Sequence, residues 1–308
     1  MPNSLNRAVV ADTSCSPYAQ LKPVQLTSVK LGDGFWRARR QTSLRVTLPS
    51  QHHLLEETGH FDNFRRASGK LASAHRGRAS ADSDVYKWLE AASWALATEA
   101  DPDLRSMVDA AITEIVDAQQ PDGYLNGYYA GERAGARWSN LRDQHELYCA
   151  GHLFQAAVAH YRATGEMRLL DAAQRFADLI CDTFGAGDGQ SPGVPGHPGI
   201  EMALVELARA TGEARYLAQA RYFLDARGHG LIGGQAHLLD HQPFRALKRL
   251  VGHAVRALYL SAGAADVYAE TGDPDLGETL ARLWGHLVTR QMYISGGVGA
   301  RYQGEVFG

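Results

Sequence analysis

Helices of two kinds alternate along most of the chain. One kind is apolar nearly all the way round, in the segments Val85–Ala97, Glu146–Ala163, Ile200–Ala210 and Gly252–Tyr268. The other kind follows it and carries one apolar stripe at helical spacing, for example Leu169, Ala173, Phe176 and Ile180. A helix that is apolar on every side is buried, whereas a single stripe is typical of a half-buried helix. The pattern therefore predicts a repeated pairing of an inner helix with an outer one.

A similar turn joins the two helices of each pair. The four turns are Ala97–Pro102, Ala163–Glu166, Ala210–Glu213 and Glu270–Pro274. Gly caps a helix that it follows, and the prolines of the first and last turns suit the first position of the next helix. Repeated hairpins of this kind predict an all-α toroid of helix pairs, and the pattern accounts for about nine helices. The turns recur too unevenly for a tetratricopeptide or HEAT solenoid.

The N-terminal segment differs from the helical remainder. Residues 1–23 are polar, with scattered Ser, Asn and Pro, which predicts a flexible leader. Val24–Leu31 alternates between apolar and polar residues, so we expect a short strand there. Residues 24–308 then form one helical domain.

Three histidines fall at corresponding places in the helix pattern. His145, His197 and His253 each lie near the N-terminal end of an inner helix, and so at roughly one level of a toroid. The loops 120–129 and 293–299, with Glu305 shortly after, return to the same end. We therefore predict that the three imidazoles, a carboxylate and aromatic residues face one central pocket. The alternative is three separate core histidines, each hydrogen-bonded to a neighbour.

Such a pocket suits a small polyhydroxylated ligand, because aromatic rings cover sugar faces and imidazoles bond hydroxyls. Glu305 is a general acid if burial raises its pKa, and otherwise a solvated acid on a loop. Zinc held by the three histidines is disfavoured, since they come from separate helices and no HExxH motif is present. A Cys149–His145 nucleophile pair is a further alternative, but a small buried Cys that fills space explains Cys149 more simply.

The composition narrows the partners and the compartment. A net charge of −3 and a pI near 6.5, without a basic block, argue against nucleic-acid and membrane surfaces. The three cysteines are far apart and form no CxxC pattern, which favours a reducing compartment over a disulfide framework. We see no signal-peptide core or membrane-spanning run and expect a cytoplasmic protein.

A series of short motifs runs along the chain: Asp33–Trp36, Asn63–Arg65, Asp82–Ala91, Asp122–Asn126, Arg137–Leu141, His145–His152, Pro195–Pro198, Gly252–Arg256, Tyr293–Gly299 and Gly304-Glu305. Each motif alone is weak, but their order and spacing are specific. Over residues 28–308 they resemble those of glycoside hydrolase family 127, the β-L-arabinofuranosidases. The resemblance implies an (α/α)6 barrel with β-sandwich domains. Such a barrel has twelve helices, so we expect an incomplete (α/α)6-type toroid with about nine of them.

The resemblance also implies roles for individual residues. His145, His197 and His253 match histidines that bond the arabinofuranose, and Glu305 matches the carboxylate taken as general acid/base. The family hydrolyses terminal β-L-arabinofuranosides with retention, through a zinc-bound cysteine thiolate as nucleophile. The family's zinc ligands lie in sequence after the Gly-Glu motif, and therefore beyond Gly308. We expect this chain to bind no zinc and to be inactive alone.

The resemblance leaves several states of the chain open. Residues 24–308 correspond to the N-terminal portion of a catalytic domain, truncated at its C-terminal end. The chain is then a truncated product, a half that needs a C-terminal partner or missing continuation, or a non-catalytic sugar-binding fragment. Truncation is favoured because the end falls inside an active-site loop and not at a domain boundary. A sugar epimerase or isomerase on an α/α barrel, with histidine acid/base pairs, is the alternative function.

Overall fold

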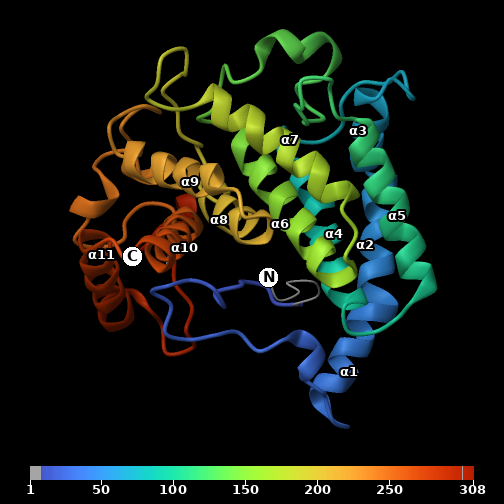
Figure 1. Cartoon of the computed structure of the whole chain (residues 1–308), viewed down its shortest axis with the longest axis horizontal. Helices are drawn as coiled ribbons and strands as arrows, with labels where there is room; N and C mark the ends of the chain where they lie inside the picture. Colours follow the sequence, from blue (N-terminus) through green and yellow to red (C-terminus); the bar gives the residue numbers. More distant parts are fainter. Residues whose placement is uncertain (1–7, 300) are drawn as a thin grey trace. The chain divides into compact units, whose positions relative to one another are not determined.

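The computed structural model describes residues 8–299 and 301–308, and this part of the chain is helical without a β-sheet. Figure 1 shows its helices, coloured along the sequence. Residues 1–7, the start of the predicted leader, lie outside the described residues. The α-helices are α1 (Phe35–Thr42), α2 (Leu48–Glu57), α3 (His60–Ala67), α4 (Asp82–Leu96), α5 (Pro102–Asp117), α6 (Glu146–Thr164), α7 (Arg168–Thr183), α8 (Ile200–Thr211), α9 (Ala214–Ala226), α10 (Ala254–Thr271) and α11 (Pro274–His286).

The predicted hairpins correspond to the pairs α4–α5, α6–α7, α8–α9 and α10–α11. The sequence predicts about nine helices, and the described residues form eleven α-helices because the segment 35–67 contributes three short ones, α1 to α3. The turns have the expected chemistry. Asp101 and Asp273 cap α5 and α11 through their carboxylates, and a proline follows each of them. Gly212 and Gly272 end α8 and α10 in the left-handed conformation.

The predicted strand at Val24–Leu31 is wrong. This segment contains a single 3-10 turn, Leu26–Ser28, and no ladder partner lies beside it in the described part of the chain. Alternation gives a stable strand only when a neighbouring strand takes up its backbone hydrogen bonds. Instead, Ser28 N–H bonds to Gln25 O and Val29 N–H bonds to Leu26 O.

The described chain divides into two compact units. Among the described residues, unit 1 comprises residues 8–12, 22–139 and 152–179, and unit 2 comprises residues 13–21, 140–151, 180–299 and 301–308. The boundary crosses α6 and α7, so the first turns of α6 and the last turn of α7 belong to unit 2.

Aromatic side chains form much of the core of unit 1. Phe176 lies against Phe154, with ring centroids 6.2 Å apart, and against Tyr124 at 5.3 Å. The ring of Trp88 in α4 lies 4.9 Å from that of His52 at a tilted angle, and its indole N–H donates to Leu48 O at 2.9 Å. The indole N–H is thus satisfied inside the core, as a buried Trp requires.

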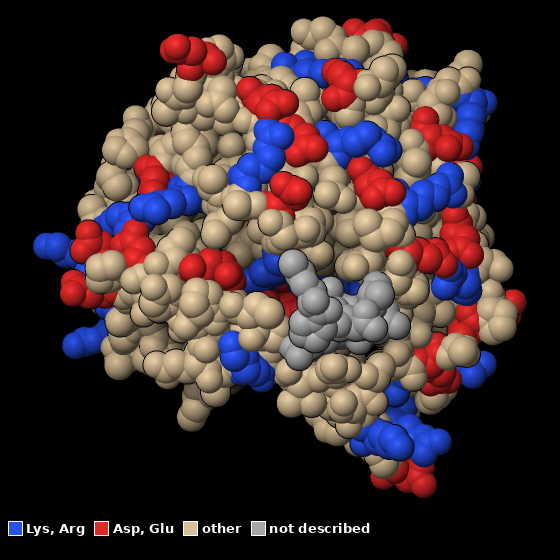
Figure 2. Space-filling model, in the orientation of Figure 1, with Lys and Arg blue, Asp and Glu red and all other residues tan. Residues whose placement is uncertain are grey.

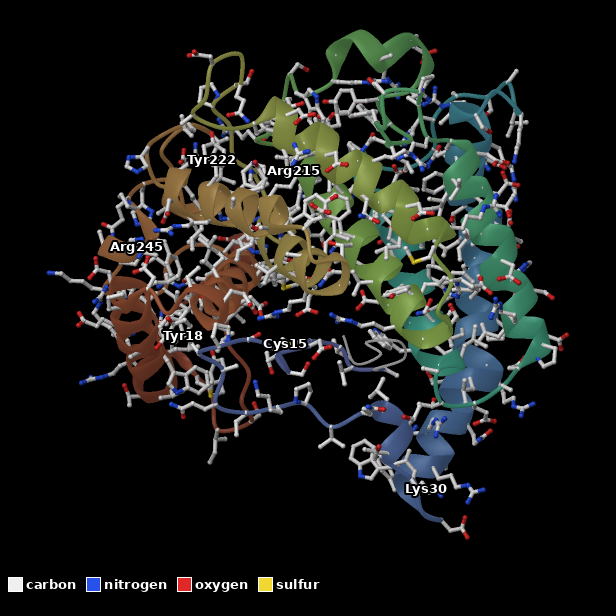
Figure 3. The ribbon with its side chains drawn as sticks, viewed as in Figure 1. Cys15, Tyr18, Lys30, Arg215, Tyr222 and Arg245 are labelled. Carbon is white, nitrogen blue, oxygen red and sulfur yellow. The ribbon has the colours of Figure 1, made fainter. Side chains whose placement is uncertain are left out.

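In unit 2, α8 packs against both α9 and α10, and α11 packs against α10 (Figure 1). The N-terminal residues 13–21 also belong to this unit. Tyr18, labelled in Figure 3, donates its backbone N–H to Ala269 O at 3.1 Å, and Ser16 donates its hydroxyl to Glu270 at 2.5 Å. The end of α10 is therefore covered by an irregular segment from near the start of the sequence.

Charged side chains of both signs are interspersed on the face drawn in Figure 2. Charged residues of unit 1 also form ion pairs, such as Lys70 with Glu114 at 3.0 Å and with Asp117 at 2.8 Å. Exposed pairs of this kind add little stability, and they do not create a field of one sign. None of the helices in the described residues is long and apolar enough to cross a bilayer.

Asp82, the first residue of α4, is buried in unit 1 and 1% exposed. Its Oδ2 accepts from the backbone N–H of Gly127 at 2.6 Å, while its Oδ1 has no hydrogen-bond partner among the described residues. A Cβ on Gly127 would lie 2.6 Å from Oδ1, so only glycine allows this approach. Burial raises the pKa of Asp82 to about 6, and the Gly127 N–H opposes that rise.

We expect Asp82→Asn to change how stability depends on pH. A carboxyl whose pKa is raised in the folded state binds its proton more tightly there, so wild-type stability falls as pH rises from 4 through 6. Between pH 5 and pH 8 the variant should gain about 1 to 3 kcal/mol relative to the wild type, measured by urea unfolding.

Asp84→Asn is the matched control, two residues further along α4. The pKa of Asp84 is lowered, first by its hydrogen bond to His60, so its ionised form stabilises unit 1 above pH 4. This variant should lose stability relative to the wild type as pH rises. The same pH trend in both variants would contradict the assignment.

Candidate functional site

The three predicted histidines lie at the starts of three helices of unit 2. His145 directly precedes α6, His197 lies in the loop before α8, and His253 is the N-cap residue of α10. His197 and His253 are buried, 8% and 7% exposed, whereas His145 is intermediate. All three therefore lie at corresponding ends of successive inner helices.

The structure brings the three imidazoles together. The ring centroids of His145 and His197 are 5.7 Å apart, and those of His197 and His253 are 5.8 Å apart. Two tyrosines complete this histidine cluster: the ring of Tyr148 lies 4.5 Å from that of His197, and the ring of Tyr259 lies 5.7 Å from it. The cluster thus combines hydrogen-bonding rings with apolar faces.

The backbone at His145 is held in an uncommon conformation. Its φ of 58° lies in the left-handed region, which non-glycine residues seldom adopt. The carbonyl of His145 accepts the N–H of Cys149 at 2.9 Å, the first bond of α6. Its Nδ1 is bonded to Asp143 O at 2.9 Å. The first contact fixes the backbone of His145 at the start of α6, and the second fixes its ring.

The loop that carries His197 packs tightly on the segment before α6. Gly196 donates its N–H to Leu141 O at 2.8 Å, and a Cβ on Gly196 would lie 1.8 Å from Arg142 O. Only glycine permits this approach of two backbones. Nδ1 of His197 is bonded to Pro198 O at 2.7 Å, which sets the rotation of the ring.

The fourth predicted residue, Glu305, contacts His253. His253 Nε2 lies 2.7 Å from Glu305 Oε2. Glu305 has a φ of 52°, and its neighbour Val306 forms a backbone bridge with His253. The Glu305 side chain is 74% exposed. The carboxylate is therefore anchored at one oxygen and open to a ligand.

Arg256 and His237 also contact the cluster, although neither was predicted from the sequence. Arg256, on the first turn of α10, donates from Nη1 to His237 Nε2 at 2.9 Å, and the His237 ring lies 5.5 Å from that of His253. Arg256 belongs to the Gly252–Arg256 motif, so its position was available to sequence reasoning. His237 lies in a loop without periodicity, and no sequence signal indicated it.

Burial keeps His197 uncharged. Desolvation lowers the pKa of His197 to about 3, with smaller contributions from the charges of Arg256 and the neighbouring histidines. Burial likewise lowers the pKa of His237 and of Arg256, and the Glu305 carboxylate opposes both shifts. His197 is consequently a neutral hydrogen-bonding group across the physiological range.

A buried arginine connects the loops of two of these histidines. Arg227 is 0% exposed, and it donates to Pro195 O through Nη2 and to Leu238 O through Nη1, the latter at 2.9 Å. Pro195 is two residues before His197, and Leu238 directly follows His237. Arg227 Nη2 also lies 3.8 Å from a carboxylate oxygen of buried Glu201. The arginine therefore fixes both loops and pairs with a buried charge.

The described residues do not provide ligands for a zinc ion. Cys15 (Figure 3) is exposed, Cys149 and Cys181 are buried, and none of the three forms a disulfide in the described residues. Within residues 8–299 and 301–308, no group of three or more His, Cys, Asp or Glu is arranged to hold a metal. His145 and Cys149 are one turn apart, but Cys149 is 1% exposed and packs in the core.

Successive hairpins of a buried helix and a half-buried one are typical of α/α-toroid proteins. The chain belongs to glycoside hydrolase family 127. Residues 28–308 match the model of the beta-L-arabinofuranosidase GH127 catalytic domain.

Individual relatives agree with this family. The chain is 34% identical to the non-reducing end beta-L-arabinofuranosidase of Bifidobacterium longum subsp. longum, over 91% of this chain and 49% of that protein. Its structure is similar to that of a GH127 beta-L-arabinofuranosidase from Geobacillus stearothermophilus T6, with a TM-score of 0.88, 42% identity, and coverage of 91% and 48%. A second GH127 beta-arabinofuranosidase structure also gives 0.88, with 39% identity and coverage of 99% and 48%.

The chain spans about half the length of these relatives. The predicted family and the predicted all-α fold of toroid-type hairpins are confirmed by the matches. The roles of His145, His197, His253 and Glu305 stay predictions, although the structure places the four side chains in one cluster.

Arg227→Met should destabilise unit 2 strongly. The substitution leaves Glu201 as a buried charge without its counter-ion and two buried carbonyls without a donor, which costs about 3 to 5 kcal/mol. Urea unfolding measures this loss. Arg221→Met is the control on the same helix, because Arg221 is exposed and its ion pairs should contribute less than about 1 kcal/mol. Equal losses in the two variants would contradict the role of Arg227.

Proposed function

We propose that the chain binds a terminal β-L-arabinofuranosyl residue at the histidine cluster and that Glu305 is the general acid/base of its hydrolysis. The observation that carries the proposal is the 2.7 Å contact between His253 Nε2 and Glu305 Oε2, within a cluster of three imidazoles. Family membership and relatives described as beta-L-arabinofuranosidases supply the substrate class.

The chemistry of the cluster agrees with a sugar ligand. A neutral imidazole such as that of His197 exchanges hydrogen bonds with hydroxyls, and tyrosine rings such as Tyr148 cover an apolar sugar face. Glu305 lies beside the cluster with its second oxygen exposed, so a glycosidic oxygen can approach it. Under this proposal Glu305 donates a proton to the leaving oxygen and then accepts one from water, as the acid/base of a retaining glycosidase does.

Zinc and a nucleophile are also part of what the family resemblance implies for a complete enzyme. Because the described residues do not fit a zinc ion, no step is assigned to the metal here. The proposal concerns the residues that recognise the sugar and move the proton.

Binding is the first test of the proposal. We expect methyl β-L-arabinofuranoside to bind the full chain measurably by calorimetry, and more tightly than its α anomer. His197→Ala removes one hydrogen bond and a buried ring, so affinity should fall about tenfold or more. The control His241→Ala changes an exposed histidine of the same unit and should bind like the wild type. Unchanged affinity in His197→Ala would contradict the assignment.

The role of Glu305 requires a test with two leaving groups. With zinc added, any hydrolysis of β-L-arabinofuranosides by the chain should fall in Glu305→Gln by about 10² to 10⁴ for an alkyl glycoside. A nitrophenyl glycoside should lose less, because its leaving group needs little protonation. Equal losses for both substrates would argue against a general acid. Interconversion of free sugars without hydrolysis would instead support an epimerase.

A further inference from the structure

The direction of hydrogen bonding at each cluster histidine is set by the backbone. In all three rings Nδ1 is bonded to a main-chain atom, at 2.9 Å in His145, 2.7 Å in His197 and 3.1 Å in His253. A carbonyl oxygen can only accept a hydrogen bond, and an amide N–H can only donate one. The identity of the partner therefore determines which ring nitrogen carries the hydrogen.

His145 and His197 carry a hydrogen on the same ring nitrogen. Their partners are the carbonyls of Asp143 and Pro198, so Nδ1 carries the hydrogen in both rings. Desolvation lowers the pKa of His197 to about 3, and that ring is neutral near pH 7. Nε2 of His197 then holds a lone pair and can only accept.

His253 has the opposite tautomer. As N-cap of α10, its Nδ1 accepts the backbone N–H of Arg256. An imidazole nitrogen that accepts has no hydrogen, so the hydrogen lies on Nε2. This Nε2–H donates to Glu305 Oε2 at 2.7 Å. A flipped ring would place carbon atoms against both the Arg256 amide and the carboxylate, and would satisfy neither.

We propose that His253 is a positioning residue whose Nε2–H holds Glu305, that Nε2 of His197 is an acceptor for a ligand hydroxyl, and that His145, like His197, carries a hydrogen on Nδ1. The ligand part of this inference rests on the proposed function. Nε2 therefore donates in His253 and accepts in His197. The ligand group that meets His197 must donate a hydrogen. Because Oε2 of Glu305 is occupied by His253, Oε1 is the oxygen that carries the mobile proton.

Tautomers are measured directly in the ligand-free chain by long-range ¹H–¹⁵N correlation spectra of the imidazole rings. We expect the hydrogen on Nδ1 in His145 and His197 and on Nε2 in His253, with signals assigned from single histidine variants. A hydrogen on Nε2 of His197, or on Nδ1 of His253, would overturn the inference. Because no sugar is present, this outcome is distinct from a failure to bind an arabinofuranoside.

Two substitutions at His253 separate its contacts. In His253→Asn the shorter side chain still caps the Arg256 amide but cannot reach Glu305, whereas in His253→Gln the longer amide reaches Glu305 and is a poor cap. The ¹³C carboxyl resonance of Glu305 should shift in the Asn variant and stay near its wild-type position in the Gln variant. A resonance that moves only in the Gln variant, or in neither, would show that His253 does not position Glu305.

Helix capping gives the matched readout in the same pair of variants. The unfolding midpoint should stay near that of the wild type in His253→Asn and should fall in His253→Gln. The carboxyl signal and the stability thus respond to opposite variants. A purely structural role of His253 would make both measurements follow the cap.

Discussion

The buried guanidinium group of Arg227 constrains the loops of the histidine cluster. Arg227 is fully buried, and a buried guanidinium is tolerated only when carboxylates and carbonyls surround it. Here the carbonyls of Pro195 and Leu238 and the carboxylate of Glu201 meet that requirement. Two of these groups belong to the loops of His197 and His237. Because the buried guanidinium needs both carbonyls, the loops that carry His197 and His237 are held against Arg227.

Helix starts supply the second constraint. The first amides of a helix lack partners within it, and the aligned peptide dipoles place partial positive charge there. A protonated imidazole is disfavoured at such a place, whereas a neutral one is not. His253 satisfies an orphan amide of α10 through its own ring. A helix N-terminus thus fixes Nδ1 of His253 as an acceptor, whereas the carbonyls of Asp143 and Pro198 fix Nδ1 of His145 and His197 as donors.

Much of the fold could be predicted because it depends on local patterns. Periodicity and turn chemistry gave α6 and α8 to within a residue or so, and they placed His145, His197 and His253 at the helix starts. The alternation at Val24–Leu31 predicted a strand wrongly, because a strand depends on a neighbouring strand that the local sequence does not specify. The short helices α1 to α3 lack the long apolar stripe that made the later pairs recognisable.

The contacts that organise the site depend on tertiary structure, and this is why sequence reasoning missed them. Arg227 ends a half-buried helix, where an arginine is usually solvated, and only the folded loops reveal its carbonyl partners. The contact between His253 and Glu305 joins residues far apart in the chain, and family motifs name both without their hydrogen-bond polarity. That polarity comes from an amide and two carbonyls. Because His145, His197, His253, Glu305 and Arg227 all belong to unit 2, it is set within that unit alone.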